Sequence, residues 1–345
     1  MKRFLTSVVA FAVGLAVISI LILCTAQNPL STLASFFLKP FYSQWYFGNM
    51  LNKMGLLLCA SIGAIFALKT GNFNLGGEGQ IYIAGLLTAV LLKSSRFSFS
   101  LPQFVLVFFI AGLAAGVFGM FCGLLKIRFG ISELLSSFLL SAASLPIIDY
   151  LIIGPVRDTS GNLLATAPIE NEFFLTQLLP PSYLNGSFVF SIVLCIAVAI
   201  FFSRTSAGYR LQTGGKAPEF AFFSGFSVYA PSLWGMFASA FFHGLVGFFA
   251  VTGTWHLCHL GFSAGIGWAA LAIALIARLN VYALIPASFL YAWVESASDT
   301  AVMSGTMQFN TAIFLQASIF LLISAEFFTR KKFPREPKPE SGVRI

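Results

Sequence analysis

The stretch KTGNFNLGGEGQIYIAG, residues 69–85, places charged, amide and glycine residues between two long apolar segments. Unpaired backbone amides are strongly unfavourable in hydrocarbon, so irregular backbone survives at membrane depth only when it is buried in protein or lines a wet cavity. The pattern therefore predicts a broken helix. Asn74 is the predicted N-cap, and the helix resumes through Gly76 and Gly77 with Glu78 in its first turn, where the helix dipole favours an acid.

The composition around this stretch is that of a membrane protein. Of 345 residues, 58% are hydrophobic and 9% are charged, with a mean hydropathy of +0.88; soluble domains carry about 25% charged residues. Apolar runs long enough to cross a bilayer as helices recur along the chain. They do not alternate as barrel strands do. We therefore predict an all-α, polytopic membrane protein, and the composition excludes a soluble enzyme.

Ten apolar windows predict about ten transmembrane helices, because roughly 20 residues are needed to span the hydrocarbon. The windows are residues 5–25, 46–68, 77–93, 101–125, 131–154, 188–203, 231–254, 263–279, 282–298 and 308–328.

The distribution of Lys and Arg predicts that both termini are cytoplasmic. With the N-terminus inside, the cytoplasmic side receives most basic residues, including a basic tail over residues 329–345. Residues 1–328 then form a single transmembrane domain. The net charge of +8 is explained by this orientation, so no nucleic-acid partner is predicted.

Two longer polar stretches lie between the predicted spans. Residues 155–187 are rich in proline and fall on the extracytoplasmic side, where a docking or lid loop and a plain connector are both open interpretations. Residues 204–228 are cytoplasmic, and Pro218 stands where the first turn of a short helix outside the membrane would begin.

Several polar residues within or directly beside the apolar windows are functional candidates, because burying them is unfavourable. They are Lys53, Glu133, Asp149, Glu295 and Asp299. The cysteines are scattered singly and HLCHL, residues 256–260, lacks a fourth metal ligand, so neither a disulfide framework nor a metal site is predicted. No phosphate-binding loop or nucleophile motif is present, which predicts a chain without an ATPase site or any other catalytic residue.

The 69–85 stretch itself has two open interpretations. It is either a cytoplasmic turn whose glycines allow close helix packing, or a half-helix beside a transport path. In the second interpretation the predicted path residues are Asn72, Asn74, Glu78 and Gln80.

Four motifs, in order, resemble one family. GNFNLGGEGQIYIAG, FGISELLSSFLLSA, TSAGYRLQTGGKAPEFAFFSGFSV and GIGWAALAIALIARLN are similar to segments of permease subunits of bacterial ATP-binding cassette (ABC) importers for branched-chain amino acids, simple sugars and nucleosides. The resemblance extends from about residue 45 to residue 325 and is nearest to the nucleoside and simple-sugar branch.

The resemblance implies a multi-pass permease of the bacterial cytoplasmic (inner) membrane that works by alternating access. The implied partners are two ATPase subunits, a second permease subunit (identical or a paralogue), an extracytoplasmic solute-binding protein, a small solute and the lipid bilayer. ATP and Mg²⁺ would be bound by the ATPases, and this chain would bind no cofactor. A cytoplasmic coupling helix over residues 216–224 is implied, with ATPase-coupling residues Gly215, Lys216, Pro218, Glu219 and Ala221.

The resemblance gives a nucleoside or simple-sugar-like solute as the expected cargo. Riboflavin or a branched-chain amino acid is the alternative within the same importer class. An ion-coupled secondary transporter built on inverted repeats is the alternative from another class; it predicts uptake that is driven by a gradient without ATP.

Overall fold

The computed structural model describes residues 28–94 and 100–303, together with 16, 19–20, 22–24 and 26. The predicted span 308–328, the basic tail 329–345 and most of the predicted span 5–25 lie outside these residues. Over the described part the fold is all-α, as predicted, and the only β-type pairing there consists of isolated bridges.

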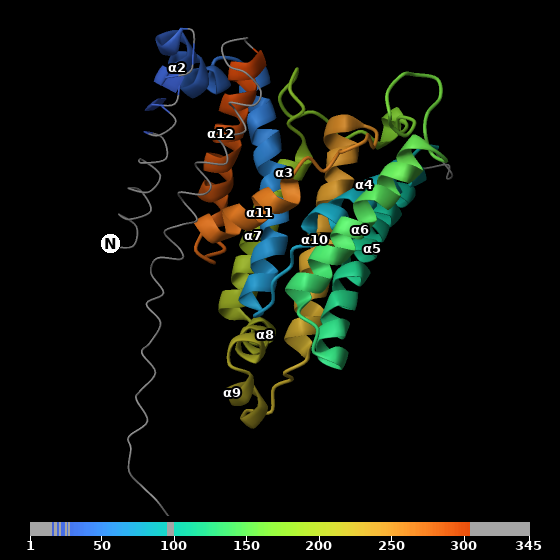
Figure 1. Ribbon diagram of the computed structural model, residues 1–345, viewed down its shortest axis with the longest axis vertical. Coiled ribbons are helices and arrows are strands. Elements are labelled where there is room, and N and C mark those ends of the chain that lie inside the picture. Colours follow the sequence, from blue (N-terminus) through green and yellow to red (C-terminus); the bar gives the residue numbers. More distant parts are fainter. Residues whose placement is uncertain are drawn as a thin grey trace, which may run out of the picture.

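The helices follow one another along the chain as labelled in Figure 1. They are α2 (Pro29–Leu38), η1 (Lys39–Phe41), α3 (Gln44–Lys69), α4 (Gly77–Leu91), α5 (Ser100–Phe129), α6 (Glu133–Ile153), η2 (Asn171–Phe173), α7 (Gly186–Arg204), α8 (Ser206–Lys216), α9 (Pro218–Phe223), α10 (Ala230–Ala250), η3 (Val251–Trp255), α11 (Ile266–Ile276) and α12 (Leu284–Met303).

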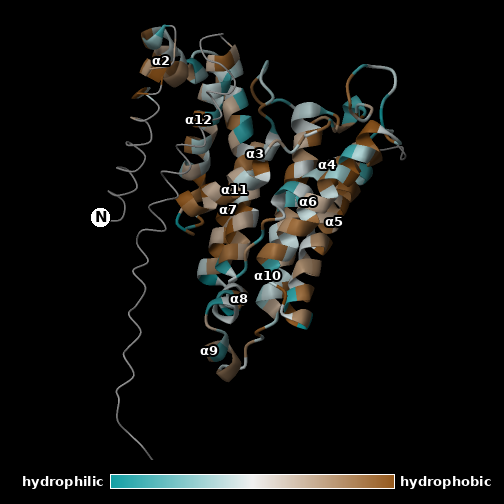
Figure 2. Ribbon diagram, in the orientation of Figure 1, coloured by the Kyte–Doolittle hydropathy of each residue, from teal (hydrophilic) through white to brown (hydrophobic). Residues whose placement is uncertain are grey.

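Among the described residues, five helices are long and apolar enough to cross a membrane: α3, α5, α6, α7 and α10 continued by η3. They agree with five of the predicted windows, and Figure 2 shows apolar residues along their length. Helices α4 and α11 are apolar but shorter. The 11 residues of α11 rise only about 16 Å, so the predicted span 263–279 does not cross the bilayer as one straight helix.

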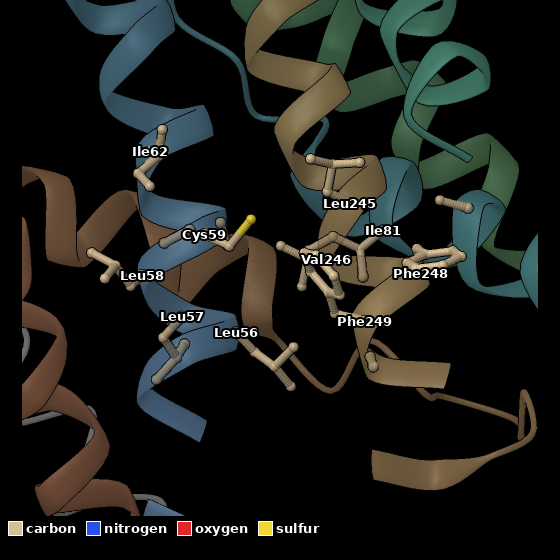
Figure 3. Close-up of a cluster of buried hydrophobic side chains, with 14 of the residues drawn as sticks. Leu56, Leu57, Leu58, Cys59, Ile62, Ile81, Leu245, Val246, Phe248 and Phe249 are labelled. Carbon is tan, nitrogen blue, oxygen red and sulfur yellow. The ribbon is translucent and has the colours of Figure 1, made fainter. Parts of the chain in front are cut away.

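Helices α3 and α10 form the centre of the subunit. In their most apolar windows 83% and 78% of the residues are buried, against 28% to 33% in α5, α6 and α7. Figure 3 shows Leu56 and Cys59 of α3 pointing towards Val246 and Phe249 of α10. The remaining helices are arranged around this pair, and α5, α6 and α7 carry the large outward-facing apolar surfaces.

Side-chain caps fix where several helices begin. Ser43 accepts a hydrogen bond from the Tyr46 amide at the start of α3, and Asn185 accepts one from the Ser187 amide at the start of α7. Such caps satisfy amides that have no partner inside the helix.

The loop 155–187 packs against the end of the bundle at which α3 and α7 begin. We call this the outer end, because the charge distribution predicts that it is extracytoplasmic. The loop is fastened by backbone hydrogen bonds: Thr166 donates to Cys258 (2.9 Å), Ile169 to His256 (2.8 Å) and Leu175 to Thr252 (2.9 Å). It is therefore an ordered layer over the outer end.

Candidate functional site

The break between α3 and α4 has the predicted form. Helix α3 ends at Lys69, and residues 70–76 run back into the bundle as an irregular linker, which Figure 1 shows rising from the end of α3 to the start of α4. Gly71, with a φ of 73°, turns the chain at the start of this linker, and the left-handed region is readily open only to glycine. Apart from the exposed Gly71, the linker residues are buried or partly buried, so most of this irregular backbone is covered by protein.

The predicted N-cap residue is wrong by two positions, because Gly76 rather than Asn74 is the N-cap of α4. The Asn74 side-chain oxygen accepts a hydrogen bond from the Gly76 amide (2.9 Å), so it closes a local turn before the helix instead of capping it. Glu78 lies in the first turn of α4, as predicted.

Asn74 and Gln80 belong to one buried network. The Asn74 amide group donates to the Gln80 oxygen (3.0 Å) and to the Ser239 hydroxyl (2.9 Å). His243 of α10 hydrogen-bonds to the same Gln80 oxygen (2.9 Å). The network fixes the start of α4 against α10.

Two serines of α6 supply acceptors for amides at the start of α4. The Leu75 amide donates to Ser137 (3.0 Å) and the Gly79 amide to Ser141 (2.8 Å). The sequence interpretation missed both serines. Their spacing of four residues, on one face of a helix, is the signal that could have identified them.

Glu78 joins α4 to α11. Its two carboxylate oxygens accept hydrogen bonds from the amides of Gly265 (2.7 Å) and Gly267 (2.8 Å). Gly265 is the N-cap of α11, with a φ of 83°. One buried carboxylate therefore lies beside the N-termini of two short helices, where both helix dipoles and both amides favour its negative charge.

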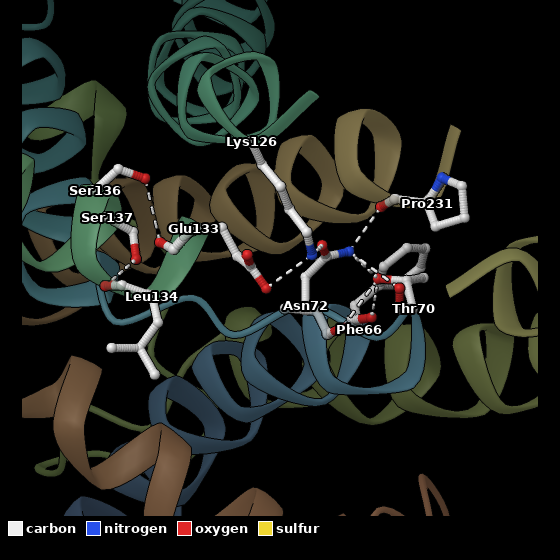
Figure 4. A network of polar contacts seen from close by, with 10 residues as sticks. Phe66, Thr70, Asn72, Lys126, Glu133, Leu134, Ser136, Ser137 and Pro231 are labelled. Carbon is white, nitrogen blue, oxygen red and sulfur yellow. Dashed lines mark hydrogen bonds and ion pairs between the residues drawn. The ribbon is translucent and has the colours of Figure 1, made fainter. Parts of the chain in front are cut away.

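Asn72 holds the other end of the linker (Figure 4). Its amide group donates to the Pro231 carbonyl of α10 (2.8 Å), and its oxygen accepts from Lys126 of α5 (3.0 Å). Lys126 in turn pairs with Glu133 of α6 (3.0 Å). The linker, α5, α6 and α10 thus meet in one polar cluster.

The four predicted path residues are all buried, with exposed fractions of 9% or less, and each is hydrogen-bonded within the subunit. The structure brings Asn74 and Gln80 together. Glu78 faces α11, and Asn72 lies in the separate cluster near the end of α5. Their contact with a solute stays a prediction.

The predicted coupling segment contains the end of α8 and all of α9. Pro218 occupies the first turn of α9, as predicted, and Ala221 is fully buried. Phe220, Phe222 and Phe223 are 56%, 69% and 86% exposed. A six-residue helix therefore presents an aromatic surface beyond the bundle, at its lower end in Figure 1.

The remaining predicted coupling residues lie around this surface. Glu219 and Lys216 are exposed, and Gly215 packs its backbone directly against the Thr70 carbonyl and Gly71 of the α3–α4 linker. A side chain at either glycine would collide with this backbone. The α8–α9 unit is thus in direct contact with the linker.

The candidates Lys53, Glu295 and Asp299 form one ionic cluster between α3 and α12. Lys53 pairs with Asp299 at 2.6 Å and with Glu295 at 3.5 Å. The sequence interpretation singled out all three residues and placed Glu295 and Asp299 on one helix face, but it did not pair them with Lys53. The cluster contains two carboxylates and one ammonium group.

The described residues contain no group of three His, Cys, Asp or Glu side chains that could hold a metal ion. Within HLCHL, His256 stacks on Phe174 of the outer loop, with ring centroids 3.7 Å apart. Burial lowers the pKa of His256 and raises the pKa of the Cys258 thiol to about 12. These side chains help to hold the outer loop.

Comparison with known proteins matches residues 46–324 to the model of a permease family, branched-chain amino acid transport system / permease component. A probable riboflavin import permease protein of Treponema pallidum (strain Nichols) is 45% identical over 95% of this chain and 87% of its own length. A guanosine ABC transporter permease of Bacillus subtilis (strain 168) is 22% identical over 96% of this chain and 95% of its own.

A glucose ABC transporter permease of Haloferax volcanii is 25% identical over 94% of this chain and 88% of its own length. No solved structure matches the chain.

Proposed function

This chain belongs to the family of permease components of branched-chain amino acid transport systems, and we propose that it is the permease subunit of an importer for riboflavin. The family makes it a multi-pass membrane permease of a bacterial ABC importer, a transport subunit rather than an enzyme. The choice of riboflavin rests on one observation, the 45% identity to the riboflavin permease over nearly the whole chain.

That identity favours riboflavin over a nucleoside or simple sugar as the cargo. The guanosine and glucose permeases are only 22% and 25% identical over similar lengths. A nucleoside or simple sugar, the cargo that the motifs favoured, is therefore supported less well than the alternative.

In the proposed mechanism two ATPase subunits drive alternating access through the exposed phenylalanines of α9. Closure of the ATPases moves the α8–α9 unit as a rigid body. The unit transmits this motion to the α3–α4 linker because Gly215 and Gly71 touch through their backbones. A solute-binding protein delivers the cargo at the outer end, and a second permease subunit completes the path.

The cargo is tested by uptake into cells that cannot make riboflavin and that express the chain with its ATPase and binding protein. We expect saturable, ATP-dependent uptake of riboflavin that excess guanosine and glucose do not compete away. Uptake of guanosine in place of riboflavin would overturn the proposed cargo. Gradient-driven uptake without any ATPase would overturn the importer class.

The role of α9 is tested by Phe223→Ser, with Tyr229→Ser as a matched control. Both side chains are exposed aromatics, at 86% and 63%, but Tyr229 lies outside α9. We expect Phe223→Ser to lose most co-purifying ATPase while the permease stays in the membrane, and Tyr229→Ser to retain it. Equal ATPase recovery from both variants would exclude α9 as the docking element.

A further inference from the structure

Residues 256–265 form an irregular segment that runs along α4 from the outer loop to the first turn of that helix. Its first residue, His256, accepts a hydrogen bond from Ile169 of the outer loop (2.8 Å). Further on, the Gly261 amide donates to the Tyr82 hydroxyl of α4 (3.0 Å), and the Gly265 amide donates to Glu78 (2.7 Å). We call residues 256–265 the descending segment.

The descending segment reaches membrane depth. Leu92, at the far end of α4, accepts a hydrogen bond from Glu170 of the outer loop. Glu78 lies about 20 Å further along the helix at 1.5 Å per residue. Since the hydrocarbon layer is about 30 Å thick, the Gly265 end of the segment lies well inside it.

The lower part of this segment is both irregular and uncovered. Gly261, Ala264 and Gly265 have φ values of 71°, 45° and 83°, and Gly261 and Ala264 are exposed in the subunit. The Gly261 and Gly265 amides have partners within the subunit, but lipid-exposed irregular backbone does not occur within the hydrocarbon layer, where any remaining unpaired carbonyl is costly. This face therefore meets water or a second subunit.

An aromatic surface continues the same face. Trp268, in the first turn of α11, is 48% exposed, and its ring lies 6.2 Å from that of Phe138 of α6, centroid to centroid. Tryptophans in membrane proteins concentrate at the interfaces with water, whereas Trp268 lies near the buried starts of α4 and α11. The carboxylate of Glu78 holds the turn that carries this indole.

We propose that residues 261–265 line the solute path and that the Trp268 indole stacks against a planar heteroaromatic ring of the cargo. This rests on the proposed function, because the isoalloxazine of riboflavin is such a ring. The face of an indole held at a fixed position by a helix terminus offers a flat stacking surface, and stacking without directed hydrogen bonds to the cargo favours passage over tight binding. Phe138 supports the indole from α6.

The path is tested with a membrane-impermeant thiol reagent on Ala264→Cys in the assembled transporter. The variant is made in a Cys24→Ser background, since the other cysteines are all buried. Val117→Cys, on the outward apolar face of α5 and 60% exposed, is the matched control. We expect Ala264→Cys to react, riboflavin to slow that reaction, and Val117→Cys to stay unlabelled.

An Ala264→Cys variant that imports riboflavin normally but reacts no faster than Val117→Cys would overturn the path. If the transporter carries guanosine and not riboflavin, the proposed cargo fails. Labelling of Ala264→Cys would then be slowed by guanosine and the path would stand. The two failures are therefore distinguishable.

The role of Trp268 is tested by uptake in Trp268→Ala and Trp268→Phe, each corrected for the amount of permease in the membrane. Loss of one stacking contact predicts uptake lowered roughly 3- to 10-fold in Trp268→Ala, with most of it restored in Trp268→Phe. Trp234→Ala, at a 52% exposed tryptophan near the start of α10, is the control and should transport normally. Wild-type uptake by Trp268→Ala would overturn the assignment.

Discussion

Replacing Glu78 by Gln tests the junction between α4 and α11 directly. The carboxylate has two acceptor oxygens, and each is used by one amide of the α11 N-terminus. A glutamine keeps the size and shape of the side chain but offers one acceptor and one donor group. Either Gly265 or Gly267 then loses its acceptor and faces an N–H group instead.

The free-energy change follows from the contacts that Glu78 loses. A hydrogen bond to a charged group contributes about 1.5–3 kcal/mol, and the helix terminus adds about 0.3–1 kcal/mol for the negative charge. The Glu78→Gln variant keeps one of the two contacts, so the lost hydrogen bond and the lost charge together predict a loss of about 2–4 kcal/mol. That corresponds to a roughly 30- to 700-fold shift in the equilibrium between docked and undocked α11.

Thermal unfolding of the purified permease and riboflavin uptake by the assembled transporter measure this loss. We expect Glu78→Gln to lower the unfolding midpoint and to slow uptake, while Glu172→Gln, at an exposed acid of the outer loop, changes neither. If Glu78→Gln unfolded and transported like the wild type, the carboxylate would not hold α11, and the reasoning would be refuted.

Three further changes probe other contacts. Lys53→Met leaves two carboxylates without their ammonium partner in a half-exposed cluster, so it should cost about 1–2 kcal/mol in unfolding free energy, and Asp299→Asn less. Burial lowers the pKa of His256, so its contribution is present above its unfolded pKa of about 6.5 and is lost as the pH falls. Protease cleavage of loop 155–187 should therefore accelerate as the pH falls below about 6.5, and a flat pH profile would contradict this. Gly71→Ala adds a side chain at a φ of 73° against the backbone of α8, so it should lower uptake per ATP hydrolysed in the assembled transporter; an unchanged ratio would contradict the contact.

The sequence predicts the helix break well because its determinants are local. Glycines and amide side chains between apolar runs indicate where regular backbone stops, and the first-turn position of Glu78 follows from the same few residues. The position of the N-cap was missed because the Asn74 oxygen accepts from the amide two residues on, at Gly76, which an N-cap side chain and a local turn both do. Local chemistry alone does not choose between a helix that begins after Asn74 and one that begins after Gly76.

The partners of the polar residues were not predictable, because they are distant in the chain. Glu78 and Gly265 are separated by 187 positions, and Lys53 and Asp299 by 246. The short length of α11 is also a tertiary effect. Residues 266–277 are apolar throughout, yet α11 ends at Ile276, Arg278 and Leu279 adopt positive φ values of 53° and 60° just after it, and no glycine marks the site.

These contacts connect the break between α3 and α4 to α8 on one side and to α11 on the other. The linker touches α8 at one end through Gly71 and Gly215, and at its other end begins the helix that carries Glu78. Glu78 in turn holds the N-terminus of α11, on whose first turn Trp268 lies. The first connection is a backbone contact and the second is a carboxylate that accepts two hydrogen bonds, so neither can stretch far without breaking. A displacement of α8 is thus expected to move the start of α4 as a unit. A continuous helix from Lys69 to Leu91 would have no linker, so it would lack both the contact of Gly71 with Gly215 and the position of Glu78 beside α11.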